Sequence, residues 1–244
     1  MIKPGRYPIW EIRDGEFQPF NIIPSCNFHT ISEALLDVEL PHEASLFLRG
    51  SFLEESIPHS GADIDIVIVS DEYANIEITS KIKKILAFTQ RPIEVLCLNK
   101  SQLHCNLVFR LLLHTRSFKV LGQFINIKSV KADFETMRHH FFHYKFFLLH
   151  DFLPVDKQSR LHYLKQITRT FGVIYFLNNR KMFSRDIYTC IQWAKEINNS
   201  LGCHLEEYWN TLENISFSQE INIKNLKNFL LKQSEQAASI YLSK

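Results

Sequence analysis

The chain of 244 residues is long enough for one large domain or two small ones, and 45% of its residues are hydrophobic, which suffices for a sizeable core. Its formal net charge of +2 excludes a strong polyanion-binding field over the whole surface. The cysteines are odd in number, at 5, and none are paired as Cys-x-x-Cys, so no disulfide framework or structural zinc site is expected. Residues 1–17 are too charged for a signal peptide, and no apolar run approaches the roughly 18 residues of a membrane span. We therefore expect a cytoplasmic protein without a membrane partner.

The first half of the chain mixes helical and strand periodicity. Residues 1–28 are rich in proline and are expected to be irregular. Thr30, with Glu33 three residues later, has the pattern of a capping box at the start of a helix. Apolar spacing predicts helices over 30–40, 76–88 and 101–115, and strands over 45–48, 63–70, 93–98 and 118–121.

From Lys131 onward the apolar spacing is mainly helical. It predicts helices over 131–152, 156–177, 205–212 and 226–242, with a further helix that begins after Ser184 as its N-cap. The change in periodicity near 123–131 indicates a domain boundary. The predicted fold class is therefore α+β. Residues 1–125 would form an N-terminal domain with a small mixed sheet flanked by helices, and residues 126–244 an all-α helical bundle.

Acidic side chains occur at two predicted strands. Asp63 and Asp65 begin the strand over 63–70 and share one face, because side chains alternate along a strand. Two like charges held beside a buried strand are unfavourable unless a cation compensates them, and Mg²⁺ prefers such oxygen ligands. Glu94, the lone charge in the strand over 93–98, supplies a third carboxylate if the two strands are neighbours. Three carboxylates and two metal ions can promote in-line nucleotidyl transfer.

Gly50 and Ser51 follow the apolar strand that ends near Arg49. Glycine lets a backbone approach phosphate closely, and the serine hydroxyl and amide can donate hydrogen bonds to it. The alternative interpretation is an ordinary Gly-Ser turn and two solvated aspartates at a strand end. The combination of Gly-Ser, Asp-x-Asp and a later acid favours a catalytic site.

The ordered motifs resemble the DNA polymerase β-type nucleotidyltransferase superfamily. They are Leu48-Arg49-Gly50-Ser51, a spacer, Asp63-Ile64-Asp65, and then Ile93-Glu94-Val95. The helical half is similar in layout to stand-alone bacterial members such as aminoglycoside adenylyltransferases. One departure is Gly61-Ala62 before Asp63, where the family often has serine.

The resemblance implies roles for these residues. Asp63, Asp65 and Glu94 would be catalytic and would bind metal, with Glu94 either a metal ligand or the base that takes the acceptor proton. Gly50 and Ser51 would bind the nucleotide. The cofactors would be two Mg²⁺ ions, with ATP or another nucleoside triphosphate as substrate.

Two stretches without Asp or Glu, 95–132 and 157–185, carry basic side chains. Most of these charges are expected to be ordinary solvated ones. Lys165 and Arg169 are the preferred nucleotide-binding pair, because residues i and i+4 share a helix face. An RNA acceptor would engage more of these side chains and would bind less tightly in salt. The near-neutral net charge disfavours RNA.

The expected activity is transfer of a nucleoside monophosphate, most simply AMP from ATP, to an acceptor hydroxyl with release of pyrophosphate. An aminoglycoside-like small molecule ranks first as acceptor, followed by a protein side chain, as in antitoxin-type AMP transferases, and by a tRNA end. Acids that could line a pocket for a cationic acceptor are Asp186, Glu196, Glu206 and Glu207. The alternative of another class is a non-catalytic module that binds nucleotide or pairs with a toxin.

Overall fold

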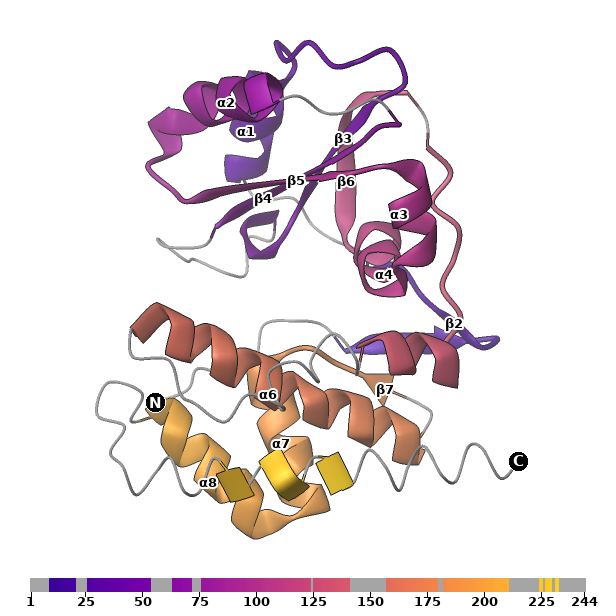
Figure 1. Cartoon of the computed structure of the whole chain (residues 1–244), viewed down its shortest axis with the longest axis vertical. Helices are drawn as coiled ribbons and strands as arrows, with labels where there is room; N and C mark the ends of the chain where they lie inside the picture. The colour runs from indigo at the N-terminus through magenta and orange to yellow at the C-terminus, as the bar shows by residue number, and fades with distance from the viewer. Residues whose placement is uncertain are drawn as a thin grey trace. The chain divides into compact units, whose positions relative to one another are not determined.

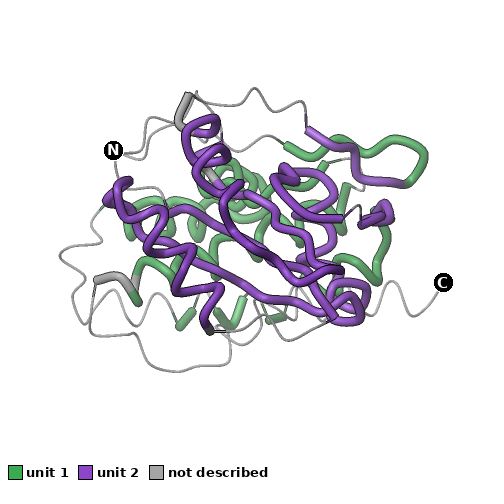
Figure 2. The backbone as a smooth tube through the Cα atoms, turned by 90° about the horizontal axis from the view of Figure 1, so that it is seen from above, with its two compact units in different colours: residues 1–15, 132–244 green, residues 16–131 purple. Residues whose placement is uncertain are grey.

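The structure is a computed structural model of the whole chain. It describes residues 9–20, 26–53, 63–71, 76–123, 125–140, 157–179 and 182–210, with 224, 225, 227–229, 231 and 232. The described chain has the predicted α+β fold and divides into two compact units (Figure 2). One unit comprises residues 16–131, and the other comprises residues 1–15 with 132–244. The domain ranges expected from the sequence, 1–125 and 126–244, stay a prediction.

A mixed four-stranded sheet organises the unit of residues 16–131 (Figure 1). Its strands are β3 (Ser45–Arg49), β4 (Ile64–Val69), β5 (Ile93–Leu98) and β6 (Ser117–Gly122). The order across the sheet is β5-β4-β3-β6. β3 is antiparallel to both of its neighbours, whereas β4 and β5 are parallel. A parallel pair needs a crossover connection, and the chain between β4 and β5 contains helix α2 (Ile76–Ile85).

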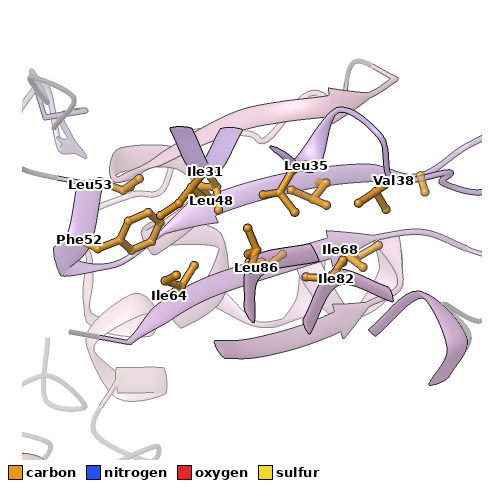
Figure 3. Close-up of a cluster of buried hydrophobic side chains, with 13 residues drawn as sticks. Ile31, Leu35, Val38, Leu48, Phe52, Leu53, Ile64, Ile68, Ile82 and Leu86 are labelled. Atoms are coloured by element: carbon orange, nitrogen blue, oxygen red, sulfur yellow. The ribbon is translucent and has the colours of Figure 1, made fainter. Parts of the chain in front are cut away.

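The two faces of this sheet are buried by different helices. On one face Ile64, Ile66 and Ile68 pack with residues of α1 (Cys26–Leu35) and α2 (Figure 3). Each such side chain contributes roughly 1.5–3 kcal/mol when it is fully buried. On the other face, Val67 and Val69 pack with residues of α3 (Lys100–Cys105) and α4 (Leu107–Thr115). The strict alternation along β4 therefore decides which helices each side chain meets.

Three helix boundaries in this unit differ from the prediction. α1 spans Cys26–Leu35, so Thr30 lies inside the helix and does not cap it. The helix predicted over 76–88 ends at Ile85 and continues as the 3-10 helix η2 (Leu86–Thr89). The helix predicted over 101–115 is broken at Asn106, whose side-chain Oδ1 accepts from the backbone N–H groups of Val108 (3.1 Å) and Phe109 (3.2 Å). A side chain that caps a new helix in this way ends the preceding one.

Three helices share one core in the other unit. They are α6 (Lys157–Asn179), α7 (Ile187–Ile197) and α8 (Asn199–Asn210). The N-cap of α7 is Asp186 and not Ser184, because the Asp186 carboxylate accepts from the Thr189 N–H while the Ser184 hydroxyl accepts from Asp186 N–H. None of the helices in the described ranges is long and apolar enough to cross a membrane.

The predicted helix over 131–152 begins later than expected. Lys131 forms a β-bridge with Glu16, and the described helical residues are 134–140. The Asp133 side chain accepts from the Thr136 N–H at 2.9 Å, as an N-cap does. Residues 141–152 of that prediction, and most of the predicted helix over 226–242, lie outside the described residues.

The prediction that residues 1–28 are irregular is wrong for two short strands. β1 (Trp10–Arg13) pairs antiparallel with β7 (Met182–Phe183), and the Trp10 and Phe183 rings stack at 5.3 Å. The second strand is β2 (Glu16–Phe17). A partner so distant in the sequence is invisible to local periodicity.

Candidate active site

A row of charged side chains crosses three neighbouring strands of the mixed sheet. The register pairs Arg49 on β3 with Asp65 on β4, and Asp65 with Glu94 on β5. Directly paired residues project from the same face of a sheet, on strands about 4.8 Å apart. Phe47 and Val67, two residues along from Arg49 and Asp65, pack in the core formed with α3 and α4. The row therefore lies on the α3/α4 face of the sheet.

Asp63 directly precedes β4, and strand alternation places it on the same face as Asp65. The Ile64 N–H donates to the Pro92 carbonyl at 2.9 Å, which holds this end of β4 beside β5. Asp63 and Glu94 are exposed and Asp65 is partly buried. The condition set for a third carboxylate, that these two strands be neighbours, is met. The catalytic and metal-binding roles of Asp63, Asp65 and Glu94 stay a prediction.

Arg49 is held in the row by an anion and an aromatic ring. Its guanidinium Nη2 lies 3.5 Å from Asp65 Oδ1, with the two side chains 20% and 24% exposed. Its Cζ lies 5.9 Å from the centroid of the Phe109 ring, on α4, at the outer limit of a cation–π contact. The Arg49 Nε is buried and has no hydrogen-bond partner among the described residues.

The Gly50 backbone brings the chain close to Asp65. Gly50 has φ +101°, a region that residues with a side chain rarely adopt. A Cβ at this position would overlap Asp65 Oδ2 and lie 3.2 Å from Asp65 Cγ. Ser51 then begins the 3-10 helix η1 (Ser51–Leu53), in which the Leu53 N–H donates to the Gly50 carbonyl at 3.3 Å. Glycine is therefore required beside Asp65. Asp63, Asp65 and Glu94 together are called the acidic row below. The nucleotide-binding roles of Gly50 and Ser51 stay a prediction.

These residues fit Mg²⁺ by chemistry and by face, because Asp63, Asp65 and Glu94 offer hard carboxylate oxygens on one side of the sheet. Their side chains do not converge on one point. Across the described ranges, no group of three or more His, Cys, Asp or Glu side chains is placed to hold a metal ion. Asp65 instead lies against the Arg49 guanidinium. Binding a metal at this row would require the Asp65 carboxylate to exchange that partner.

Lys165 and Arg169 lie one turn apart on α6, as predicted for a shared helix face. Both are partly buried, and the Arg169 Nε donates to the Arg185 carbonyl at 3.2 Å. Arg169 therefore has a structural contact within its own unit. The role of this pair in nucleotide binding stays a prediction.

Asp186 and Glu206, which belong to the acids proposed for a cationic acceptor, have structural partners. The Asp186 carboxylate is buried and accepts from the Thr189 N–H at 2.7 Å and from the Thr189 hydroxyl at 2.9 Å. Glu206 forms an ion pair with Lys195 at 2.8 Å. Capping and ion pairing account for these two side chains without an acceptor.

Arg49 is the residue of this site to which the sequence assigned no role. It stands in the motif as the residue before Gly50, at the end of an apolar strand. A strong base at that position is a local signal. Arg49 contacts Asp65 on β4 and Phe109 on α4, and these contacts between different elements cannot be read from the sequence.

No protein-family model and no curated protein matches the sequence. The structure is similar to the solved structure of the spectinomycin adenyltransferase AAD(9) from Enterococcus faecialis with ATP and spectinomycin. The TM-score is 0.48 at 13% sequence identity, and the match covers 84% of this chain and 98% of that chain. A likeness at this level says nothing about chemistry, so any function has to be argued from the residues of this chain.

Proposed function

We propose that this chain is a nucleotidyltransferase that transfers a nucleoside monophosphate, AMP from ATP in the simplest case, to an acceptor hydroxyl. The observation that carries the proposal is the parallel pairing of Asp65 with Glu94, on the strand next to the Gly50 turn. This pairing brings a motif that is scattered from Gly50 to Glu94 in the sequence to one face of one sheet. A chance Gly-Ser turn and solvated aspartates would require no such pairing.

The residues divide into a phosphate-binding part and an acidic part. The backbone N–H groups at Gly50 and Ser51 would bind phosphate oxygens of the nucleotide. Asp63, Asp65 and Glu94 would hold Mg²⁺, which when bound supplies charge stabilisation on the transferring phosphate and the leaving pyrophosphate. The acceptor oxygen forms a bond to the α-phosphorus, and the bond from that phosphorus to the pyrophosphate oxygen breaks. Glu94, which is exposed, would take the acceptor proton or serve as a metal ligand.

A small-molecule hydroxyl, such as that of an aminoglycoside, ranks first as acceptor. The formal net charge of +2 gives little general attraction for RNA. A protein side chain and a tRNA end remain the alternatives for the same chemistry. Asp186, Glu196, Glu206 and Glu207 stay the candidate acids for a cationic acceptor, although Asp186 and Glu206 also have structural partners.

A second candidate function is a nucleotide-binding or toxin-pairing module without turnover. The observation that favours it is the arrangement of the carboxylates of Asp63, Asp65 and Glu94. The carboxylates do not converge, and Asp65 forms an ion pair with Arg49. A protein that binds nucleotide only would need no metal exchange at Asp65.

Incubation with ATP labelled at the α-phosphate and with Mg²⁺, in the presence of aminoglycosides, cell protein or tRNA, tests both candidates. The label should move to one acceptor class, while ATP labelled at the γ-phosphate should release labelled pyrophosphate only. Asp63→Asn and Glu94→Gln should each lower turnover by at least about 10²-fold, because each removes a charge that stabilises the transition state. Both side chains are exposed, so these variants should fold.

Glu39→Gln is the matched control, because Glu39 is an exposed acid that pairs with Lys81 on α2, away from the acidic row. It should retain full turnover. Full turnover in both Asp63→Asn and Glu94→Gln would contradict the proposed mechanism. ATP binding without pyrophosphate release in any acceptor arm would favour the binding module.

A further inference from the structure

Arg49 forms a long ion pair with Asp65 and directly precedes the Gly50 turn, which would bind phosphate under the proposed function. Its contact with Asp65 is a single one at 3.5 Å, longer than the 2.7–2.9 Å of a strong charge-assisted hydrogen bond. Its neighbour in the chain is Gly50, where a phosphate would bind under the proposed function. Arg49 therefore contacts Asp65 and directly precedes the residue at which phosphate would bind.

The hydrogen-bond donors of Arg49 are not all satisfied by the described residues. The Nε is buried without a hydrogen-bond partner among them. Leaving such a donor unsatisfied is costly, and a natural structure with one calls for an explanation. A planar guanidinium suits phosphate because two of its N–H groups can reach two oxygens at once.

The Phe109 ring gives Arg49 a support that does not depend on Asp65. The ring lies on α4, and the guanidinium lies over it at 5.9 Å. A flat cation can move across an aromatic face while it keeps part of that contact. The side chain can thus exchange one anion for another without losing its contact with the Phe109 ring.

We propose that Arg49 is a nucleotide-binding residue that exchanges anions: it neutralises Asp65 when no metal is bound, and it binds a phosphate oxygen of the nucleotide when a metal holds Asp65. This inference rests on the proposed nucleotidyl transfer. Its consequence is that metal and nucleotide bind cooperatively. Metal alone must displace Arg49 from Asp65, whereas metal with nucleotide gives Arg49 a new partner.

The affinity for metal and the affinity for nucleotide should therefore change in opposite directions when the positive charge of Arg49 is removed. Mn²⁺, followed by its EPR signal, serves as the metal probe, and α,β-methylene-ATP, which cannot undergo transfer, serves as the nucleotide. Arg49→Met should bind Mn²⁺ alone roughly tenfold more tightly than the unaltered chain, because a repelling charge is lost. It should bind the nucleotide with Mn²⁺ roughly ten- to hundredfold more weakly.

Arg49→Lys keeps the charge and loses the planar fork, so Mn²⁺ affinity should stay within about twofold while nucleotide affinity falls. Lys81→Met is the matched control, because Lys81 also forms an ion pair of 3.5 Å but on α2. It should change neither affinity. A purely structural role of Arg49 would weaken both affinities together. If Arg49→Met does not fold, Arg49→Gln, which keeps a polar tip, takes its place.

The outcomes separate this inference from the proposed function. The exchange is refuted, and the nucleotidyltransferase proposal stands, if three results occur together. The unaltered chain binds Mn²⁺ and nucleotide, Asp63→Asn weakens Mn²⁺ binding, and Arg49→Met changes neither affinity. The exchange is also refuted if both affinities fall together. If the unaltered chain binds neither probe, the proposed function fails and the exchange fails with it.

Discussion

Gly50→Ala tests whether the backbone at Gly50 positions the acidic row. The substitution adds a Cβ at a residue with φ +101°, and that atom would overlap Asp65 Oδ2. The backbone itself need not move far, because the overlapping atom is the end of a side chain that can rotate. The rotation would carry the Asp65 carboxylate away from Arg49.

The expected cost has two parts. Forcing a residue with a Cβ into positive φ costs roughly 1–2 kcal/mol. Loss of the partly exposed ion pair between Arg49 and Asp65 adds at most about 1 kcal/mol. Gly50→Ala should therefore lower the free energy of unfolding by roughly 1–3 kcal/mol, and displacement of Asp65 should weaken Mn²⁺ binding about tenfold or more.

Gly122→Ala is the matched comparison, because Gly122 ends β6 in the same sheet with φ +95°. Its added Cβ would overlap the Ala44 carbonyl oxygen and lie 2.8 Å from the Ser45 Cα, so backbone must move. This variant should cost more than about 4 kcal/mol, while its folded fraction binds Mn²⁺ normally. Urea unfolding gives the stabilities, and EPR gives the Mn²⁺ affinities. Unchanged Mn²⁺ binding in Gly50→Ala, or a larger stability loss there than in Gly122→Ala, would refute the reasoning.

Two further predictions concern structural side chains. Asp186→Ala should lower the free energy of unfolding by roughly 1–2 kcal/mol, because α7 loses the cap made by the hydrogen bonds of 2.7 and 2.9 Å from Thr189. Asp186→Asn keeps an acceptor and should lose less stability. Equal losses for the two variants in a urea titration would argue against a capping role. The Lys100 ammonium, 2.8 Å from Glu43 and 3.0 Å from Asp71, holds the pKa of both carboxyls below their ordinary values of 4.5 and 3.8. The folded state then binds fewer protons than the unfolded state, so this stabilisation is present above those values and is lost as the pH falls through the lowered pKa values. Lys100→Met should therefore show a shallower fall in Tm on acidification than the unaltered chain, with Lys81→Met as control, and an unchanged slope would count against the ion pairs.

Local periodicity was sufficient for the sheet strands and their faces. In β4 every second residue is isoleucine, and Ile64, Ile66 and Ile68 all pack on the α1/α2 side. That alternation alone puts Asp65 on the opposite face, because a strand has a repeat of two. The same reasoning placed β5 at 93–98, where the structure has it.

Helix boundaries were predicted less well, because several polar side chains near each boundary could act as caps. Asn106 divides a continuous apolar pattern into α3 and α4, and Asp186 caps α7 although Ser184 is also a good capping residue. Thr30 and Glu33 have the right spacing for a capping box inside what is one helix. Competing local hydrogen bonds of similar energy are resolved by the packing of the helix.

The sequence by itself determined the α+β class, the strand that carries Asp63 and Asp65, and the candidate acid Glu94, because these follow from residue types and repeats along the chain. Only the tertiary structure decided that Asp65 lies between Arg49 and Glu94, and that Trp10 pairs with Phe183. Strand order and register depend on contacts between segments far apart in the chain, whose energies come from burying both partners together. The acidic row and the arginine beside it belong to that second kind of information.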